Sequence, residues 1–134
     1  MREIYSYLLL VRCDKNFVVE TRGKRIFNIS AGSYIYVGSC GINCSRVLRY
    51  IYSMRWDKKF WHIDYLLDKC SLERVLVIPN INEKDLAREL STEEFLEPVP
   101  RFGSSDDPSS RSHLFKIRNL DTDIIDKILE RIIS

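Results

Sequence analysis

The chain has 134 residues, of which 45% are hydrophobic and 30% are charged. These values are typical of one globular domain, so we expect a single domain over residues 1–134. No apolar run is long enough to span a bilayer, and the first segment, MREIYSYLLLVRC, lacks a signal-peptide cleavage pattern. We therefore expect a cytoplasmic protein with no membrane contact. The formal net charge of +2 by itself gives little attraction to nucleic acid.

The pattern of apolar and polar residues predicts both strands and helices. Strands are expected at residues 4–12, 16–20, 24–28, 34–37, 73–78 and 113–118, and helices at about 44–55, from 60 or 61 onward, at 83–90 and at 121–133. Gly23 supplies the turn of a hairpin, and the glycine-bearing segment 38–41 is expected to end the fourth strand. Asn43 is expected to cap the first helix, and Asn80 or Asn82 the third. The fold class is therefore α/β (α+β), with a small, mainly antiparallel sheet and flanking helices.

The second helix carries an apolar stripe at helical spacing. Ile63 and Leu66 belong to this stripe, so His62 and Asp64 are expected to point elsewhere. Residues 91–112 are expected to be irregular because they contain two prolines and the polar run FGSSDDPSS. A long polar loop in a compact domain is often functional.

Four cysteines, Cys13, Cys40, Cys44 and Cys70, do not match a zinc-binding pattern. Cys40 and Cys44 form a lone pair with no second pair of ligands. In a cytosolic chain we expect the four thiols to be reduced and partly buried, with a structural role. A role in metal binding is the alternative.

The charges are distributed unevenly along the chain. Residues 1–62 carry eleven Lys and Arg against four Asp and Glu, a net charge of +7. Residues 63–134 carry ten against fifteen, a net charge of −5. A basic face in the first half fits an enzyme that acts on nucleic acid, and a solvated charged surface is the alternative.

The basic half also brings a tyrosine and an arginine toward one turn. Tyr36 lies near the end of a predicted strand, and Arg46 and Tyr50 share one face of the predicted helix that follows. A guanidinium forms paired hydrogen bonds to phosphate oxygens and stays charged at any working pH. This arrangement is suited to binding a phosphate.

The motifs in this span resemble those of a known nuclease superfamily. Tyr36-Val37-Gly38, followed by Arg46 and Tyr50, resembles the second half of the GIY-YIG nuclease signature. The chain is most similar to a small, mostly archaeal branch of that superfamily, whose members are sometimes fused to endonuclease III-type glycosylases. The hallmarks of that branch resemble YVYVGS, RVxRH, WHIDYLL and GFGSSDC…SHLF, and this chain has YIYVGS, RVLRY, WHIDYLL and RFGSSDDPSSRSHLF in the same order. The similarity covers roughly residues 5–115.

The resemblance implies a GIY-YIG-like fold and a metal-dependent DNA endonuclease that hydrolyses phosphodiester bonds in DNA repair or processing. By this resemblance, Tyr7 and Tyr36 orient or deprotonate the attacking water, and Arg46 stabilises charge on the phosphoryl oxygens. Tyr50 hydrogen-bonds the nucleophile or the phosphate. Glu83 binds one Mg²⁺ or Mn²⁺ ion, and a lone carboxylate suits Mg²⁺ because this ion keeps most of its waters.

Each of these assignments has a structural alternative. Arg46 fits an ordinary surface ion pair, and tyrosines on buried strands usually serve in packing. Glu83 at the start of a helix also interacts favourably with the helix dipole. Glu89 is the second choice for the metal ligand.

The chain also departs from the superfamily pattern. Tyr5 replaces the first glycine of the signature, and Tyr50 stands where the nearest relatives usually have histidine. The late asparagine of the superfamily has no match. The cysteines that follow Ser-Ser-Asp in the relatives are replaced by Asp107 and by Ser109 or Ser110.

Further residues are assigned to substrate binding: Gly38, Arg49, His62, Ser105, Asp106 and His113. Among them we expect His62, Asp106 and His113 to form a polar cluster in a cleft that two phenols, one guanidinium and one carboxylate also line. The expected partner is DNA, with a repair glycosylase as a second partner, and the sequence does not predict the oligomeric state. The alternative function is a catalytically weak or inactive nucleic-acid-binding module of the same fold that acts with a repair enzyme.

Overall fold

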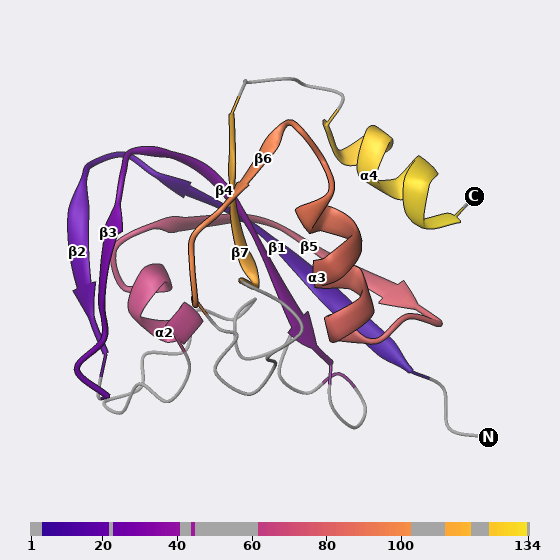
Figure 1. Ribbon diagram of the computed structural model, residues 1–134, viewed down its shortest axis with the longest axis horizontal. Helices are drawn as coiled ribbons and strands as arrows, with labels where there is room; N and C mark the ends of the chain where they lie inside the picture. The colour runs from indigo at the N-terminus through magenta and orange to yellow at the C-terminus, as the bar shows by residue number, and fades with distance from the viewer. Residues whose placement is uncertain are drawn as a thin grey trace.

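The computed structural model describes residues 4–21, 23–40, 44, 62–102, 112–118 and 124–133. Five strands form one sheet in the order β5-β1-β4-β7-β6. Their bounds are β1 Tyr5–Cys13, β4 Gly32–Ser39, β5 Ser71–Pro79, β6 Leu96–Pro98 and β7 Leu114–Ile117. Each neighbouring pair in this sheet is antiparallel. The expected α+β class with a mainly antiparallel sheet is confirmed (Figure 1).

The other elements cover the two faces of this sheet. The two-stranded hairpin β2 Phe17–Glu20 and β3 Ile26–Ile29 lies on one face together with the helix α2 His62–Leu67. The helices α3 Glu83–Ser91 and α4 Ile124–Ile133 lie on the other face (Figure 1). The predicted hairpin, the second helix and both later helices are therefore confirmed.

Strand alternation explains why the sheet has an apolar core on each face. Successive side chains of a strand point to opposite faces. In β4, Tyr34 and Tyr36 belong to the core beneath the hairpin and α2, whereas Ile35 and Val37 belong to the core beneath α3 and α4. The central strands are buried on both faces, so they read as nearly continuous apolar runs in the sequence.

Several of the expected boundaries differ from the observed ones, and three of these differences change how the chain is interpreted. The strand expected to end before residue 38 continues through Gly38 and Ser39, which pair with Tyr7 and Ser6 of β1. The segment expected to be irregular contains β6, whose Pro98 is tolerated because β6 is an edge strand. Cys44, the expected start of the first helix, has a positive φ of 52°, which is not an α-helical conformation. The rest of that helix, at 45–55, lies outside the described residues.

Two further expectations concern single side chains. Ile63 and Leu66 are buried, as their spacing predicts. Asp64 is also buried, so the expectation that it points away from the core is wrong. The side chain of His62 lies outside the part of the chain that the structure describes.

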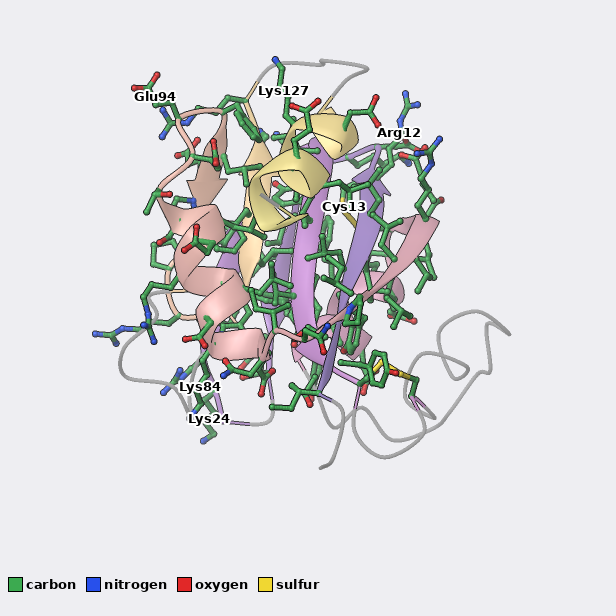
Figure 2. The ribbon with its side chains drawn as sticks, turned by 90° about the vertical axis from the view of Figure 1, so that its right-hand side faces the viewer. Arg12, Cys13, Lys24, Lys84, Glu94 and Lys127 are labelled. Atoms are coloured by element: carbon green, nitrogen blue, oxygen red, sulfur yellow. A yellow bond between two sulfur atoms is a disulfide. The ribbon has the colours of Figure 1, made fainter. Side chains whose placement is uncertain are left out.

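All four cysteines are paired in disulfides, so the expectation of reduced thiols is wrong. Cys13 at the end of β1 is bonded to Cys70, which precedes β5 (Figure 2). Cys40, just after β4, is bonded to Cys44. The spacing of the cysteines in the sequence does not predict the Cys13–Cys70 pair. The antiparallel pairing of β1 with β5 brings the end of β1 next to the start of β5, and so brings these two cysteines together. Among the described residues, none of the helices has the length and apolar character needed to cross a membrane.

Candidate functional site

One end of the main sheet gathers most of the predicted site residues that the structure describes. At this end β1 and β7 begin, β4 finishes and α3 starts (Figure 1). The backbone N–H of Cys40 donates to the carbonyl of Tyr5 at 3.2 Å, and the N–H of Val37 donates to the carbonyl of His113 at 2.8 Å. These hydrogen bonds fix three strand termini beside one another. We call this region the sheet end.

Tyr7 and Tyr36 lie side by side near the sheet end. Their ring centroids are 6.4 Å apart, with an angle of 40° between the ring planes. The ring of Tyr36 also meets Phe102 edge-on, with a centroid separation of 6.2 Å. Both tyrosines are buried in the core beneath the hairpin and α2. The predicted pair is thus brought together, but it also serves in packing.

Gly38 is placed so that the ring of Tyr7 lies directly across its backbone. The two residues are partners in the register of β1 and β4. A Cβ atom added to Gly38 would lie 2.1 Å from Cζ and 2.2 Å from the hydroxyl oxygen of Tyr7. A glycine is therefore required here for close approach of the ring, so packing accounts for Gly38 without a direct contact to substrate.

Replacing Gly38 by alanine should therefore destabilise the protein by about 1–3 kcal/mol, because the added methyl group forces the Tyr7 ring to move within a packed core. Urea denaturation followed by circular dichroism would measure this change. Gly23→Ala is the matched control, since the nearest atom to its added Cβ is 4.0 Å away. Wild-type stability for Gly38→Ala would contradict the ring placement.

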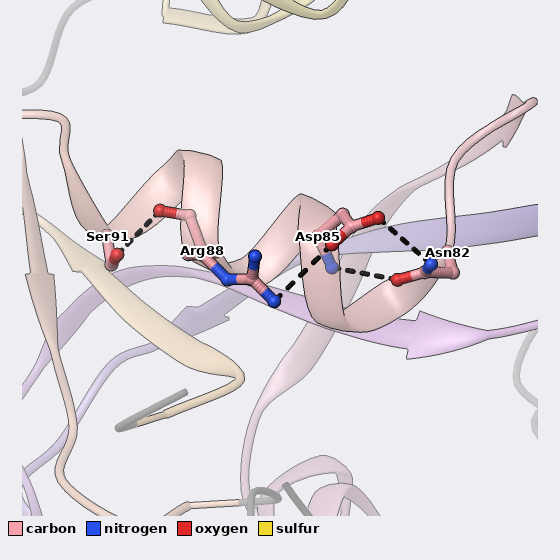
Figure 3. A network of polar contacts seen from close by, with 4 residues as sticks. All are labelled: Asn82, Asp85, Arg88 and Ser91. Atoms are coloured by element: carbon pink, nitrogen blue, oxygen red, sulfur yellow. Dashed lines mark hydrogen bonds and ion pairs between the residues drawn. The ribbon is translucent and has the colours of Figure 1, made fainter. Parts of the chain in front are cut away.

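Glu83 is the first residue of α3, and the capping of that helix fixes its position. Oδ1 of Asn82 accepts a hydrogen bond of 2.8 Å from the N–H of Asp85, so Asn82 is the N-cap, as predicted. Asp85 also accepts from Nδ2 of Asn82 at 3.0 Å and forms an ion pair of 3.4 Å with Arg88 (Figure 3). The first turn of α3 is therefore held in one geometry.

The carboxylate of Glu83 faces the imidazole of His113. Their Oε2 and Nδ1 atoms are 3.8 Å apart. The His113 side chain is 4% exposed, whereas that of Glu83 is 34% exposed. The backbone N–H of His113 donates to the carbonyl of Phe102 at 2.9 Å, and its carbonyl accepts from the N–H of Val37, so the backbone of His113 is held on both sides. Glu83 thus presents a partly exposed carboxylate beside a buried imidazole.

Ser112 lies at the sheet end and was not among the residues predicted from the sequence. Its buried hydroxyl accepts a hydrogen bond from the N–H of Leu114 at 2.9 Å and donates to the carbonyl of the same residue at 2.8 Å. These two bonds shape the entry into β7 and so help to place His113. The one sequence signal for Ser112 was that it is the serine of the SHLF motif, directly before His113.

The two tyrosines and Glu83 approach the sheet end from opposite faces of the sheet. Tyr7 and Tyr36 belong to the core beneath the hairpin and α2, whereas α3, which carries Glu83, packs with Leu86 in the core of the other face. The expectation that they line one pocket together with Arg46 stays a prediction, because Arg46 lies outside the described residues. The tyrosines and Glu83 flank the end of β4.

The other predicted site residues lie outside the described part of the chain: Arg46, Arg49, Tyr50, Ser105 and Asp106, together with the side chain of His62. The described residues contain no group of three or more His, Cys, Asp or Glu that could hold a metal ion. A site built on Glu83 alone still fits Mg²⁺, which binds through one or two carboxylates and keeps several waters. The partial exposure of this carboxylate leaves room for those waters.

A family model described as domain of unknown function DUF123 matches residues 6–133. This match spans nearly the whole chain, including every described element of the sheet end. Neither the curated proteins nor the solved structures contain a match to the chain.

Proposed function

The chain belongs to the DUF123 family, and we propose that it is a metal-dependent DNA endonuclease of GIY-YIG type that hydrolyses phosphodiester bonds. The observation that carries the proposal is the position of Glu83. Its carboxylate is partly exposed and stands beside His113, at the same end of the sheet as Tyr7 and Tyr36. The resemblance of the motifs to the GIY-YIG signature supplies the reaction class.

In the proposed mechanism, Glu83 holds a Mg²⁺ or Mn²⁺ ion, which when bound neutralises charge on the phosphate and on the leaving oxygen. His113 keeps the Glu83 carboxylate in place. The phenols of Tyr7 and Tyr36 orient the attacking water. A phenol with a pKa of about 10 is a weak base at neutral pH, so orientation is the larger part of this role.

The arrangement of the two groups favours one path for the substrate. Because the tyrosines and Glu83 approach from opposite faces, a bound phosphate backbone runs across the end of β4 rather than into a pocket on one face. The resemblance assigns Arg46 and Tyr50 to the phosphate, and Arg49, His62, Ser105 and Asp106 to the surrounding surface. In the sequence, these residues belong either to the segment that follows β4 or to the segment that precedes β7.

The resemblance also supports a role in DNA repair or processing, with a repair glycosylase as partner, and the lack of a signal-peptide pattern in the sequence supports a cytoplasmic location. The two disulfides restrict the last of these proposals. Disulfides persist mainly in oxidising compartments, with the intracellular proteins of hyperthermophiles as the main exception. A cytoplasmic location therefore fits a cell of that kind.

A plasmid-nicking experiment tests the proposed activity. The wild-type protein should convert supercoiled plasmid into relaxed and linear forms with Mg²⁺ and should leave it intact with EDTA. Arg46→Ala should lower the rate by about 100-fold, the typical effect of losing one group that stabilises transition-state charge. Arg12→Ala is the control and should cleave normally, because Arg12 pairs with Ser33 at the start of β4, away from the sheet end, and lies at the end of the molecule opposite Lys24 and Lys84 (Figure 2). No cleavage of plasmid, flap or branched DNA by the wild type would contradict the proposal.

The arrangement on opposite faces also favours a second candidate function. A nucleic-acid-binding module of the same fold would need no shared pocket, and it would use Tyr7 and Tyr36 for packing alone. This function predicts DNA binding that weakens with salt but does not depend on Glu83 or on a divalent metal. The nicking experiment separates the two candidates, since only the endonuclease cleaves.

A further inference from the structure

The β2–β3 hairpin is a ribbon that is separate from the main sheet and firmly attached to it. Its inner side chains Val19, Phe27 and Ile29 are buried in the core of that face. The ring of Phe27 meets that of Phe102 edge-on, with centroids 5.0 Å apart. A ribbon held by these contacts presents its outer face and its turn in a fixed orientation.

The outer face of this ribbon is apolar and exposed. Val18 is 59% exposed and Ile26 is 65% exposed, the two highest values among the large exposed hydrophobic residues of the described chain. In the register of the hairpin, Val18 is opposite Asn28, and Glu20 is opposite Ile26. The two apolar side chains thus occupy one face of the ribbon, with a polar residue across from each. Beside the cations of the adjacent turn, these two side chains give the ribbon an outer surface that is both apolar and basic.

The described part of the ribbon's turn is basic, and its residues are hydrogen-bonded to one another. The N–H of Thr21 donates to the carbonyl of Arg25 at 3.0 Å, and the N–H of Lys24 donates to the carbonyl of Thr21 at 2.9 Å. Lys24 has a φ of 59°, a conformation that asparagine or glycine adopts more easily. Both Lys24 and Arg25 are exposed, so the turn places two cations on the surface.

A third cation lies on the other side of the sheet. Lys84 is exposed in the first turn of α3. Lys24 and Lys84 lie at the same end of the molecule, and Arg12, Lys127 and Glu94 lie at the opposite end (Figure 2). The hairpin and α3 stand on opposite sides of the sheet (Figure 1), so the cations flank the sheet end.

We propose that the β2–β3 hairpin is a duplex-binding ribbon, with Lys24 and Arg25 on phosphates and Val18 and Ile26 against the sugars and base edges of a groove. A two-stranded ribbon has the width that the major groove admits, and apolar side chains of DNA-binding proteins make contacts of this kind. Lys84 then contacts phosphates on the other side of the sheet end. This inference deepens the proposed function, on which its substrate class rests, by assigning double-stranded DNA as the ligand of a surface outside the catalytic residues.

Fluorescence anisotropy with a labelled 20-base-pair duplex in EDTA, over a series of NaCl concentrations, tests the ribbon without cleavage. The slope of log K against log salt changes by about 0.9 for each phosphate contact. The double variant Lys24→Asn/Arg25→Gln should therefore reduce the slope by about 1.8. Lys84→Gln should reduce it by about 0.9, and the control Lys127→Ala should leave it unchanged. Asparagine is chosen because it tolerates the backbone conformation of Lys24.

A second variant tests the apolar face. Val18→Thr/Ile26→Thr keeps β-branched residues in both strands and removes apolar surface only. It should weaken duplex binding by about tenfold at every salt concentration, with the slope unchanged, because no charge is lost. Thermal melts of all variants check folding, and Lys24→Arg should restore the affinity and slope that Lys24→Asn alone loses.

The outcomes separate this inference from the proposed function. Hairpin-dependent duplex binding without any nicking would support the inference and overturn the endonuclease. Nicking with unchanged binding by the hairpin variants would overturn the inference alone. A wild-type chain that binds no duplex would overturn both, and the apolar face would then belong to a protein partner. Equal losses for Lys127→Ala and the hairpin variants would also overturn the inference.

Discussion

Replacing Glu83 by glutamine should lower the rate of Mg²⁺-dependent plasmid nicking by about 100-fold or more. Loss of an outer hydrogen-bond partner of a metal site already costs about 10–100-fold, so loss of the protein's own ligand should cost at least as much. Glutamine keeps the size of the side chain and its reach toward His113, but it lacks the negative charge that a hard cation requires. Initial rates measured over a series of Mg²⁺ concentrations provide the comparison.

Glu94→Gln is the matched control, because it makes the same chemical change at an exposed position that lies at the other end of the molecule from Lys84 (Figure 2). It should nick plasmid at the wild-type rate. Removal of a carboxylate from the first turn of a helix costs about 0.3–1 kcal/mol of stability through the helix dipole, so thermal melts must show that Glu83→Gln is folded. Normal nicking by a folded Glu83→Gln variant would leave only the helix-dipole role for this residue.

Removing the Cys13–Cys70 disulfide should produce the largest loss of stability. The bond joins residues 57 positions apart, and a loop of that length restricts the unfolded chain by about 4 kcal/mol in the chain-entropy description. The Cys40–Cys44 bond has a separation of 4 and contributes about 2 kcal/mol in the same description. Urea denaturation of Cys13→Ala/Cys70→Ala and Cys40→Ala/Cys44→Ala would measure both.

The second double variant serves as the control for the first, since each removes two sulfur atoms and one buried cysteine, Cys13 or Cys40. The difference between them therefore reports mainly the length of the closed loop. An equal or larger loss for Cys40→Ala/Cys44→Ala would contradict this account. Four thiols that react with an alkylating reagent in the native, unreduced protein would contradict both disulfides.

The sequence predicted the elements better than their arrangement. Runs such as the one in β1 were recognisable because a central strand covered on both faces is apolar at almost every position. The cap at Asn82 was recognisable because it depends on residues three positions apart. The prediction at Gly38 was wrong because glycine occurs both where a strand ends and where another side chain approaches the backbone closely. The glycine is in the strand because Tyr7 covers it.

The arrangement of the site could be predicted only in part. The tyrosines were expected to lie together, and they do, because β1 and β4 pair in an antiparallel register that sets Tyr7 and Tyr36 near each other on one face of the sheet. The face on which Glu83 lies depends on how the chain crosses from β5 to α3, and local sequence does not encode that crossing. His113 was expected in the site, but its contact with Glu83 joins residues from β7 and α3 that no spacing relates.

Anomalous diffraction from crystals grown with Mn²⁺ and a short duplex tests most directly whether Glu83 holds the catalytic metal. We predict a Mn²⁺ peak about 2.1 Å from a carboxylate oxygen of Glu83, with waters completing its coordination and a backbone phosphate of the duplex as a further ligand. A duplex bound across the sheet end with no metal at Glu83, or with the metal held by other residues, would contradict the assignment.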